Sequence, residues 1–191
     1  LPTVLSSASF GFSEDYRLTR EAFRTYLRGL KPGGVLSVTL PLLPPPRAEL
    51  RLLATVIEAA RDIGVPDPGR HIAAIRSWGT VTVLFKRIPL DRGAIAALKR
   101  FCDDRRFDLV YVPGIRQEET DRYIRMRDSS SFDAFRDIID DRTRDRFLDG
   151  YLFDIRPVGD ANPFPHYYLK LANIRETYRV VGEKWLYFFE E

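Results

Sequence analysis

The chain has 191 residues, of which 45% are apolar and 30% charged, with 30 basic and 27 acidic side chains. This balance is typical of a soluble globular protein and excludes a disordered chain. Its apolar stretches, such as VLSVTLPLL, fall far short of the roughly 20 residues that a membrane-spanning helix needs. Charges of both signs alternate, as in DDRTRDR at 140–146, so we expect no nucleic acid among the partners.

The first half of the chain predicts a helix, a strand, a second helix and a hairpin. Thr19 is a candidate cap for the first helix, which Pro32 and two glycines end. The run VLSVTL that follows is almost continuously apolar, which is typical of a strand buried on both faces. The hairpin strands are joined by three residues and are therefore antiparallel. The predicted elements are the helix 20–30, the strand 35–40, the helix 47–63 and the strands 71–76 and 80–86.

The second half predicts shorter elements and long irregular segments. Its candidates are a helix over 92–102, a strand over 109–112 and a helix that begins near Ser131. Residues 151–170 are rich in aromatic residues and proline and show no helical period. The single cysteine, Cys102, excludes an internal disulfide and a Cys-rich zinc site, and its apolar neighbours predict a buried side chain.

No catalytic or metal-ligating residue can be assigned from a motif. The sequence has no dinucleotide-binding glycine loop, Walker A, zinc-protease, nucleophile-elbow or paired-cysteine motif. Gly33 and Gly34 follow a helix and precede a strand, the reverse of a phosphate loop, so they predict a turn. His71 starts a strand and is expected at the surface or an edge. His166 lies among aromatic residues, where packing is expected and proton transfer is the alternative.

A candidate pocket wall lies before the first helix. Hydroxyl, carboxylate and aromatic side chains gather there, and they could line a ligand cleft or form a capping loop. An aromatic side chain at the hairpin tip could cover the same cleft or pack against the neighbouring helix. The candidate residues are Ser7, Ser9, Phe10, Glu14, Asp15, Tyr16 and Trp78.

The segment YRLTREAFRTYLRGLKPGGVLSV resembles the spermidine synthase family and its membrane-fused bacterial relatives, within the class I S-adenosylmethionine-dependent methyltransferase fold. IRSWGTVTVLFKR is similar to the final hairpin of that family, and FDIRPVGDANPFPHYY to a phrase of the membrane-fused group. The matching positions of the first segment are Leu18, Thr19, Glu21, Ala22, Phe23, Leu30, Pro32, Gly33 and Gly34.

The resemblance implies an α/β fold. Residues 1–90 would be the C-terminal half of a Rossmann-like methyltransferase sheet, three-layered and mixed, with an α+β extension over 91–191 packed on it. The family's glycine-rich cofactor loop would lie upstream of the chain. Its aspartate-rich loop falls on residues 7–11, SASFG, which carry no carboxylate. Because activation of an attacking amine needs a base, no catalytic residue can be carried over.

The parent protein is expected to be a transferase that moves a methyl or aminopropyl group to a small amine-like acceptor. Its cofactor would be S-adenosylmethionine or the decarboxylated form, whereas this chain alone would be inactive and bind neither. The alternative is a non-catalytic ligand-binding or interaction module of a membrane-associated protein. Either protein would be cytoplasmic, on the cytoplasmic face of the membrane if the parent is anchored there.

The expected partners follow from the strand at 35–40. The missing N-terminal half of the domain would lie beside it, and a homodimer through its exposed edge is the other expected assembly. Because an open apolar edge invites pairing, we expect the edge to be covered by the extension, by the strand 109–112 or by another molecule.

Overall fold

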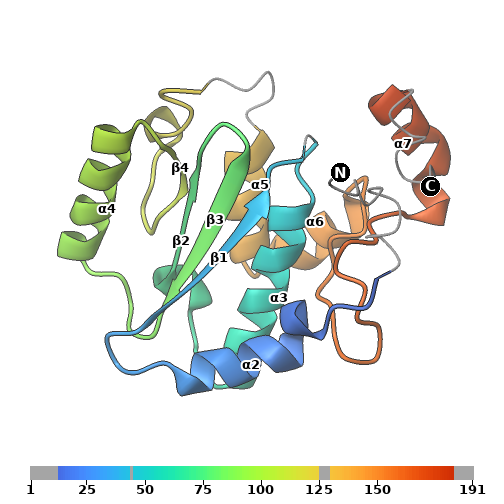
Figure 1. Ribbon diagram of the computed structural model, residues 1–191. Helices are drawn as coiled ribbons and strands as arrows, with labels where there is room; N and C mark the ends of the chain where they lie inside the picture. Colours follow the sequence, from blue (N-terminus) through green and yellow to red (C-terminus); the bar gives the residue numbers. More distant parts are fainter. Residues whose placement is uncertain (1–12, 44, 125–129, 183–191) are drawn as a thin grey trace, which may run out of the picture.

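The computed structural model describes residues 13–43, 45–124 and 130–182. It shows a four-stranded sheet with helices on both faces (Figure 1). The strand order is β1-β3-β2-β4, and every hydrogen-bonded pair is antiparallel, so the expectation of a mixed sheet is wrong. The strands are β1 (Val35–Pro41), β2 (Ile72–Arg76), β3 (Thr80–Lys86) and β4 (Asp108–Tyr111). Because β1 and β2 are both antiparallel to β3, which lies between them, they point the same way.

The helix α2 (Arg20–Gly29) forms where the sequence predicts it. The Thr19 Oγ1 accepts a hydrogen bond from the Ala22 N–H at 3.3 Å and thereby caps the first turn. A tight turn follows, in which Gly34 N–H donates to the Lys31 carbonyl at 2.8 Å. A Cβ at Gly34 would lie 3.0 Å from that carbonyl oxygen, which explains the glycine there.

The helix α3 (Ala48–Asp62) is the centre of the fold. Almost all of its side chains are buried, because it lies between the sheet, α2 and the helix α5 (Ser130–Ile139). A helix buried on all sides needs covering elements on all sides. The extension supplies one of them, and a single core contains fully buried side chains from both halves of the chain, among them Phe23, Leu53, Phe85, Phe135 and Phe153.

The opposite face of the sheet is covered by α4 (Arg92–Arg105). This helix packs on β2 and β4 through a second apolar cluster that includes Cys102, which is 2% exposed as expected. The remaining elements are short: η1 (Tyr16–Leu18), η2 (Pro68–His71), η3 (Gln117–Glu119), α6 (Arg144–Gly150), η4 (Leu171–Asn173) and α7 (Ile174–Val181). Residues 151–170 contain no helix or strand, in agreement with their sequence.

The strand β1 lies at an edge of the sheet. The expectation that it is buried on both faces is wrong, and of the three covers expected for its edge the strand 109–112 is excluded. The side chains of β1 alternate between exposed and half-buried, and Val35 is 51% exposed, so the strand is not buried on both faces. The strand β4 pairs with β2 at the opposite edge, because only two residues separate it from α4, which covers β2. Among the described residues, no strand pairs with the outer edge of β1.

His71 was expected at the surface or an edge and is buried instead. It is 9% exposed, its ring stacks on Phe85 with centroids 5.3 Å apart, and its Nδ1 lies 3.0 Å from the Lys86 carbonyl oxygen. The neighbouring strand β3 thus supplies both the ring contact and the hydrogen bond, a pairing that a local sequence pattern cannot reveal.

Candidate functional site

The candidate pocket wall before α2 is only partly described. Ser7, Ser9 and Phe10 lie outside the described residues. Glu14, just before η1, and Tyr16, its first residue, are exposed, and the Tyr16 hydroxyl donates to a Glu14 carboxylate oxygen at 3.1 Å. This bond raises the pKa of Tyr16 above its ordinary value. An exposed pair of this kind gives no sign of a ligand cleft.

Asp15 has a clear local role. Its carboxylate accepts the Arg17 N–H at 3.0 Å, which caps η1, and forms an ion pair with the Arg17 guanidinium at 2.8 Å. These bonds hold the pKa of Asp15 below its ordinary value, against the opposing effect of partial burial. The Asp15 N–H donates to the Pro163 carbonyl at 2.8 Å, which ties this turn to the extension. Asp15 therefore acts as a cap, the alternative stated for this loop.

Trp78 stands at the tip of the β2–β3 hairpin and is 82% exposed. The expectation that it packs against a neighbouring helix is therefore wrong. The tip protrudes because Ser77 and Thr80 close the turn through their own hydroxyls, 2.8 Å apart, and through the Ser77 N–H, which donates to the Thr80 carbonyl. A turn that closes on itself needs no contact with a helix.

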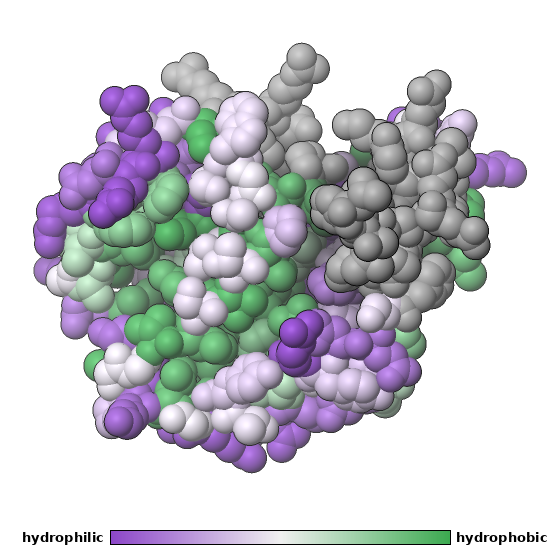
Figure 2. Space-filling model, in the orientation of Figure 1, coloured by the Kyte–Doolittle hydropathy of each residue, from purple (hydrophilic) through white to green (hydrophobic). Residues whose placement is uncertain are grey.

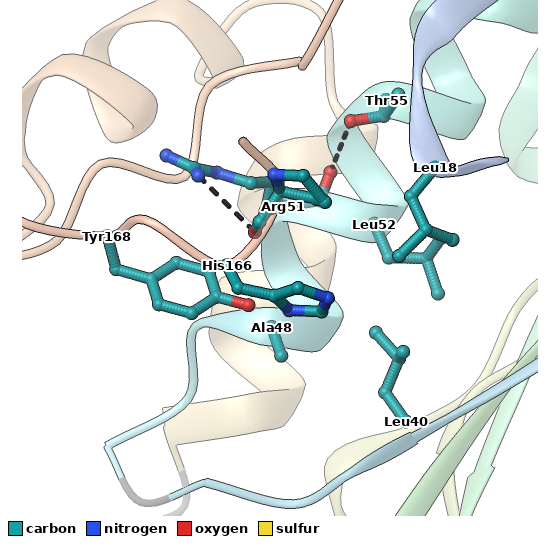
Figure 3. A pocket seen from close by; sticks show the side chains of 9 residues that line it. Leu18, Leu40, Ala48, Arg51, Leu52, Thr55, His166 and Tyr168 are labelled. Carbon is teal, nitrogen blue, oxygen red and sulfur yellow. Dashed lines mark hydrogen bonds between the residues drawn. The ribbon is translucent and has the colours of Figure 1, made fainter. Parts of the chain in front are cut away.

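A small cavity lies beyond the carboxyl end of β1, where ligands bind in many open α/β sheets (Figure 3). Its volume is about 10 Å³, room for about one water molecule. Side chains from η1, β1 and the first turns of α3 form its walls, and the extension closes it. Its lining residues, none of them among the candidates above, are Leu18, Leu40, Ala48, Arg51, Leu52, Thr55, Pro165, His166 and Tyr168.

Arg51 joins α3 to the extension beside this cavity. Its guanidinium donates to the carbonyls of Tyr167 at 2.6 Å, Phe164 at 3.0 Å and Pro165 at 3.3 Å, and also to the Asp154 carbonyl. The Asp154 carboxylate lies 3.5 Å from the same group, whose side chain is 6% exposed. These bonds from the two terminal nitrogens fix the loop in place, whereas the buried Nε has no hydrogen-bond partner among the described residues.

Glu49 is the second buried charged group of this region. It is 1% exposed, its Oε2 accepts the Arg47 N–H at 3.3 Å, and its Oε1 has no hydrogen-bond partner among the described residues. Burial raises its pKa to about 7. The guanidinium of the neighbouring Arg47 lies 5.0 Å from the centroid of the Phe153 ring, so an aromatic side chain of the extension contacts Arg47.

His166 is half-buried, and burial lowers its pKa, while the charge of Asp15 acts in the opposite direction. Figure 3 shows its ring directed toward the cavity between Leu40 and Ala48. The cavity leaves no room for a substrate beside the imidazole. In the part of the chain that the structure describes, this geometry agrees with the expected packing role, and proton transfer stays the alternative.

A second hollow lies between α5 and α6. It is open to solvent, with about 290 Å³ of space, and its lining includes Phe147 and Tyr151, whose ring centroids are 5.2 Å apart.

Across the described ranges, no group of three or more histidine, cysteine or acidic side chains is placed to hold a metal ion. No helix within them is long and apolar enough to cross a membrane.

The sequence interpretation missed Arg51 and Glu49. Both stand in the first turns of a helix, where charged side chains ordinarily face solvent. Arg51 is bonded to Asp154 and to residues 164–167, more than a hundred positions away, and the charge of Glu49 acts on Tyr151 and Tyr168 of the same distant segment. The only local signal is that apolar residues extend around the whole of α3, beyond a single stripe.

Comparison with known proteins gives no match: no family model, no curated protein and no solved structure is similar enough to place the chain in a family.

Proposed function

We propose that this chain is the C-terminal half of an S-adenosylmethionine-dependent transferase domain, inactive by itself, which acts by completing that domain through the outer edge of β1. The proposal depends on the outer edge of β1, with which no strand of residues 13–43, 45–124 and 130–182 pairs, in a sheet whose helices α2 and α3 pack together on one face. The transferred group would be a methyl or aminopropyl group, and the acceptor a small amine-like molecule, as the sequence resemblance implies.

The connections give the side on which the other half would lie. The crossover from β1 through α3 to β2 joins two strands that point the same way. Crossovers of this kind share one hand in nearly all proteins. The crossover through α3 moves from β1 toward β2. Because α2 lies on the same face as α3, a strand parallel to β1 that preceded α2 would have to move in the same direction to reach β1. It would therefore lie along the outer edge of β1.

Side chains of α3 and of the extension occupy the space beyond the carboxyl end of β1 and leave only a small cavity. This packing supports the second part of the proposal, that the chain alone binds no cofactor. A nucleoside cofactor needs a cleft of some hundreds of Å³, and the cavity there measures about 10 Å³. The buried arginine beside it is already bonded to main-chain carbonyls. The groups that hold and activate substrates would come from the other half.

Calorimetric titration of the chain with S-adenosylmethionine, and with its decarboxylated form, tests this second part. We expect no binding heat from a sample whose circular dichroism shows a folded protein. Micromolar affinity for either compound would overturn the claim that the chain lacks the cofactor site.

A non-catalytic interaction module is the second candidate, and the same edge of β1 favours it. The two functions differ in the assembled domain. A transferase binds the cofactor once a strand has been added beside β1, whereas an interaction module gives no binding heat in either state.

A further inference from the structure

The outer edge of β1 has a defined pattern of free peptide groups. At one end of the β1–β3 ladder the Arg87 N–H donates to the Gly34 carbonyl at 3.0 Å, and at the other end the Leu42 N–H donates to the Gly79 carbonyl at 2.9 Å. Even-numbered residues of β1 thus bond to β3, because hydrogen-bonded pairs alternate along an antiparallel ladder. The peptide groups of Val35, Ser37 and Thr39 point outward.

The side chains agree with this assignment. Thr39 and Thr82 face each other in the register, and their Oγ1 atoms are 2.8 Å apart. Side chains approach most closely in non-hydrogen-bonded pairs, as this assignment requires for residue 39. No hydrogen bond from the outward N–H groups to another backbone segment of the described chain is found.

The edge has little protection against pairing. Natural edge strands are usually protected by charged side chains, bulges or proline. The strand VLSVTLP carries no charge over its seven residues, and its register with β3 is continuous, without a bulge. Only Pro41 interrupts the outward N–H groups, at the last position. Figure 2 shows mainly apolar and neutral side chains over the part of this face where Figure 1 places β1 and β3.

The strand is also complementary to itself. If two copies of β1 meet antiparallel about a two-fold axis through Ser37, Val35 of each copy lies opposite Thr39 of the other. Every outward peptide group of these residues then finds a partner, and Pro41 lies beyond the pairing. On the helix-covered face Leu36 meets Val38. Pairs of β-branched and aliphatic residues of this kind are favourable across antiparallel strands.

We propose that the occupant of this edge in the chain by itself is a second copy, and that two β1 strands pair antiparallel about Ser37 to give one sheet that runs through both molecules. This inference depends on the strand geometry alone and stands whether or not the parent is a transferase. A strand of the other half-domain would occupy the same edge, so the dimer and the completed domain exclude each other.

Charged substitutions at Ser37 test whether the two-fold axis of the dimer lies at this residue. The side chain is exposed, and at the axis it lies opposite its own copy. We expect sedimentation velocity to give a dimer for the wild-type chain and for the conservative control Ser37→Thr. The single variants S37K and S37E place like charges opposite each other and should raise the dimer dissociation constant at least tenfold. An equimolar mixture of the two should restore the dimer.

A wild-type chain that stays monomeric would overturn the proposal and would leave the edge to a different polypeptide. Dimers that persist in both charged variants, or a mixture that stays monomeric, would place the contact elsewhere. Circular dichroism of each variant checks folding. If a charged variant fails to fold, Ser37→Pro replaces it, because this change removes one outward N–H and leaves the bonds to β3 intact. S37P should be monomeric, and a dimeric S37P would contradict the proposal.

Discussion

The Arg51 guanidinium donates to the Tyr167 carbonyl at 2.6 Å, across 116 positions of sequence. With its bonds to Phe164 and Asp154, it makes the irregular segment 151–170 part of the central core. A segment without a helix or strand is held in one conformation here because a buried cation satisfies its carbonyls.

Arg51→Met should therefore destabilise the protein strongly. The change leaves several buried carbonyls without a donor, and we expect the free energy of unfolding to fall by about 3–5 kcal/mol. Urea denaturation measures it. Arg156→Ala is the matched control: Arg156 pairs with Asp154 too, but its side chain is 60% exposed, so its loss should cost at most about 1 kcal/mol. Equal losses for the two variants would contradict the role given to Arg51.

Glu49 should make stability depend on pH. Its folded-state pKa of about 7 lies above its ordinary value of 4.5, because burial disfavours the charge. Between these two values the folded protein retains a proton that the unfolded chain releases. The free energy of unfolding therefore falls as pH rises through this window and levels off above it.

Glu49→Gln removes this dependence. Relative to wild type, the variant should gain up to about 3 kcal/mol between pH 5 and pH 8. Denaturation at both pH values checks this gain, and a difference between the proteins that does not change with pH would contradict it. Glu14→Gln, at an exposed position, is the control and should show no such change.

Asp108 should be needed for stability. Its carboxylate lies 3.2 Å from the Arg76 guanidinium, in a pair whose side chains are at most 1% exposed, and accepts the N–H groups of Tyr123 and Ile124 at 2.8 Å. Asp108→Asn removes the fully buried carboxylate of the two that pair with Arg76 and leaves only Asp121, at 2.6 Å, so it should cost about 3 kcal/mol. Asp103→Asn breaks the exposed pair with Arg122 and should cost less than about 1 kcal/mol. The same denaturation assay separates the two values, and a small loss for Asp108→Asn would contradict a buried pair.

Trp78 should contribute almost nothing to stability. Trp78→Ala should change the free energy of unfolding by less than about 0.5 kcal/mol, because the side chain is 82% exposed. Phe85→Ala, in the same hairpin but 1% exposed, should cost about 3–5 kcal/mol. A loss above about 1 kcal/mol for Trp78→Ala would mean that the ring packs against the protein after all.

The elements of residues 20–86 could be predicted because their signals are local. The Thr19 cap, the turn at Gly34 and the apolar run of α3 each lie within one element and its ends. The hairpin follows from the three residues that join its strands. The resemblance that suggested a transferase depends on the same segments and stays a prediction.

The position of each element in the sheet could not be predicted in this way. The strand at 109–112 was one of the three covers expected for β1, yet it pairs with β2, because edge pairing depends on where α4 packs. The burial of Glu49, Arg51 and His71 was missed for a related reason. Arg51 bonds to Tyr167 and His71 stacks on Phe85, contacts that depend on the tertiary fold, and only for His71 was a surface or edge position expected.

Amide hydrogen exchange along β1, followed by NMR at several protein concentrations, tests most directly that its outer edge is the interaction surface. We expect the amides of Leu36, Val38 and Leu40 to exchange slowly at every concentration, because they bond to β3. Those of Val35, Ser37 and Thr39 should exchange fast in dilute samples and slowly in concentrated ones. Outward amides that exchange fast at every concentration would contradict the account.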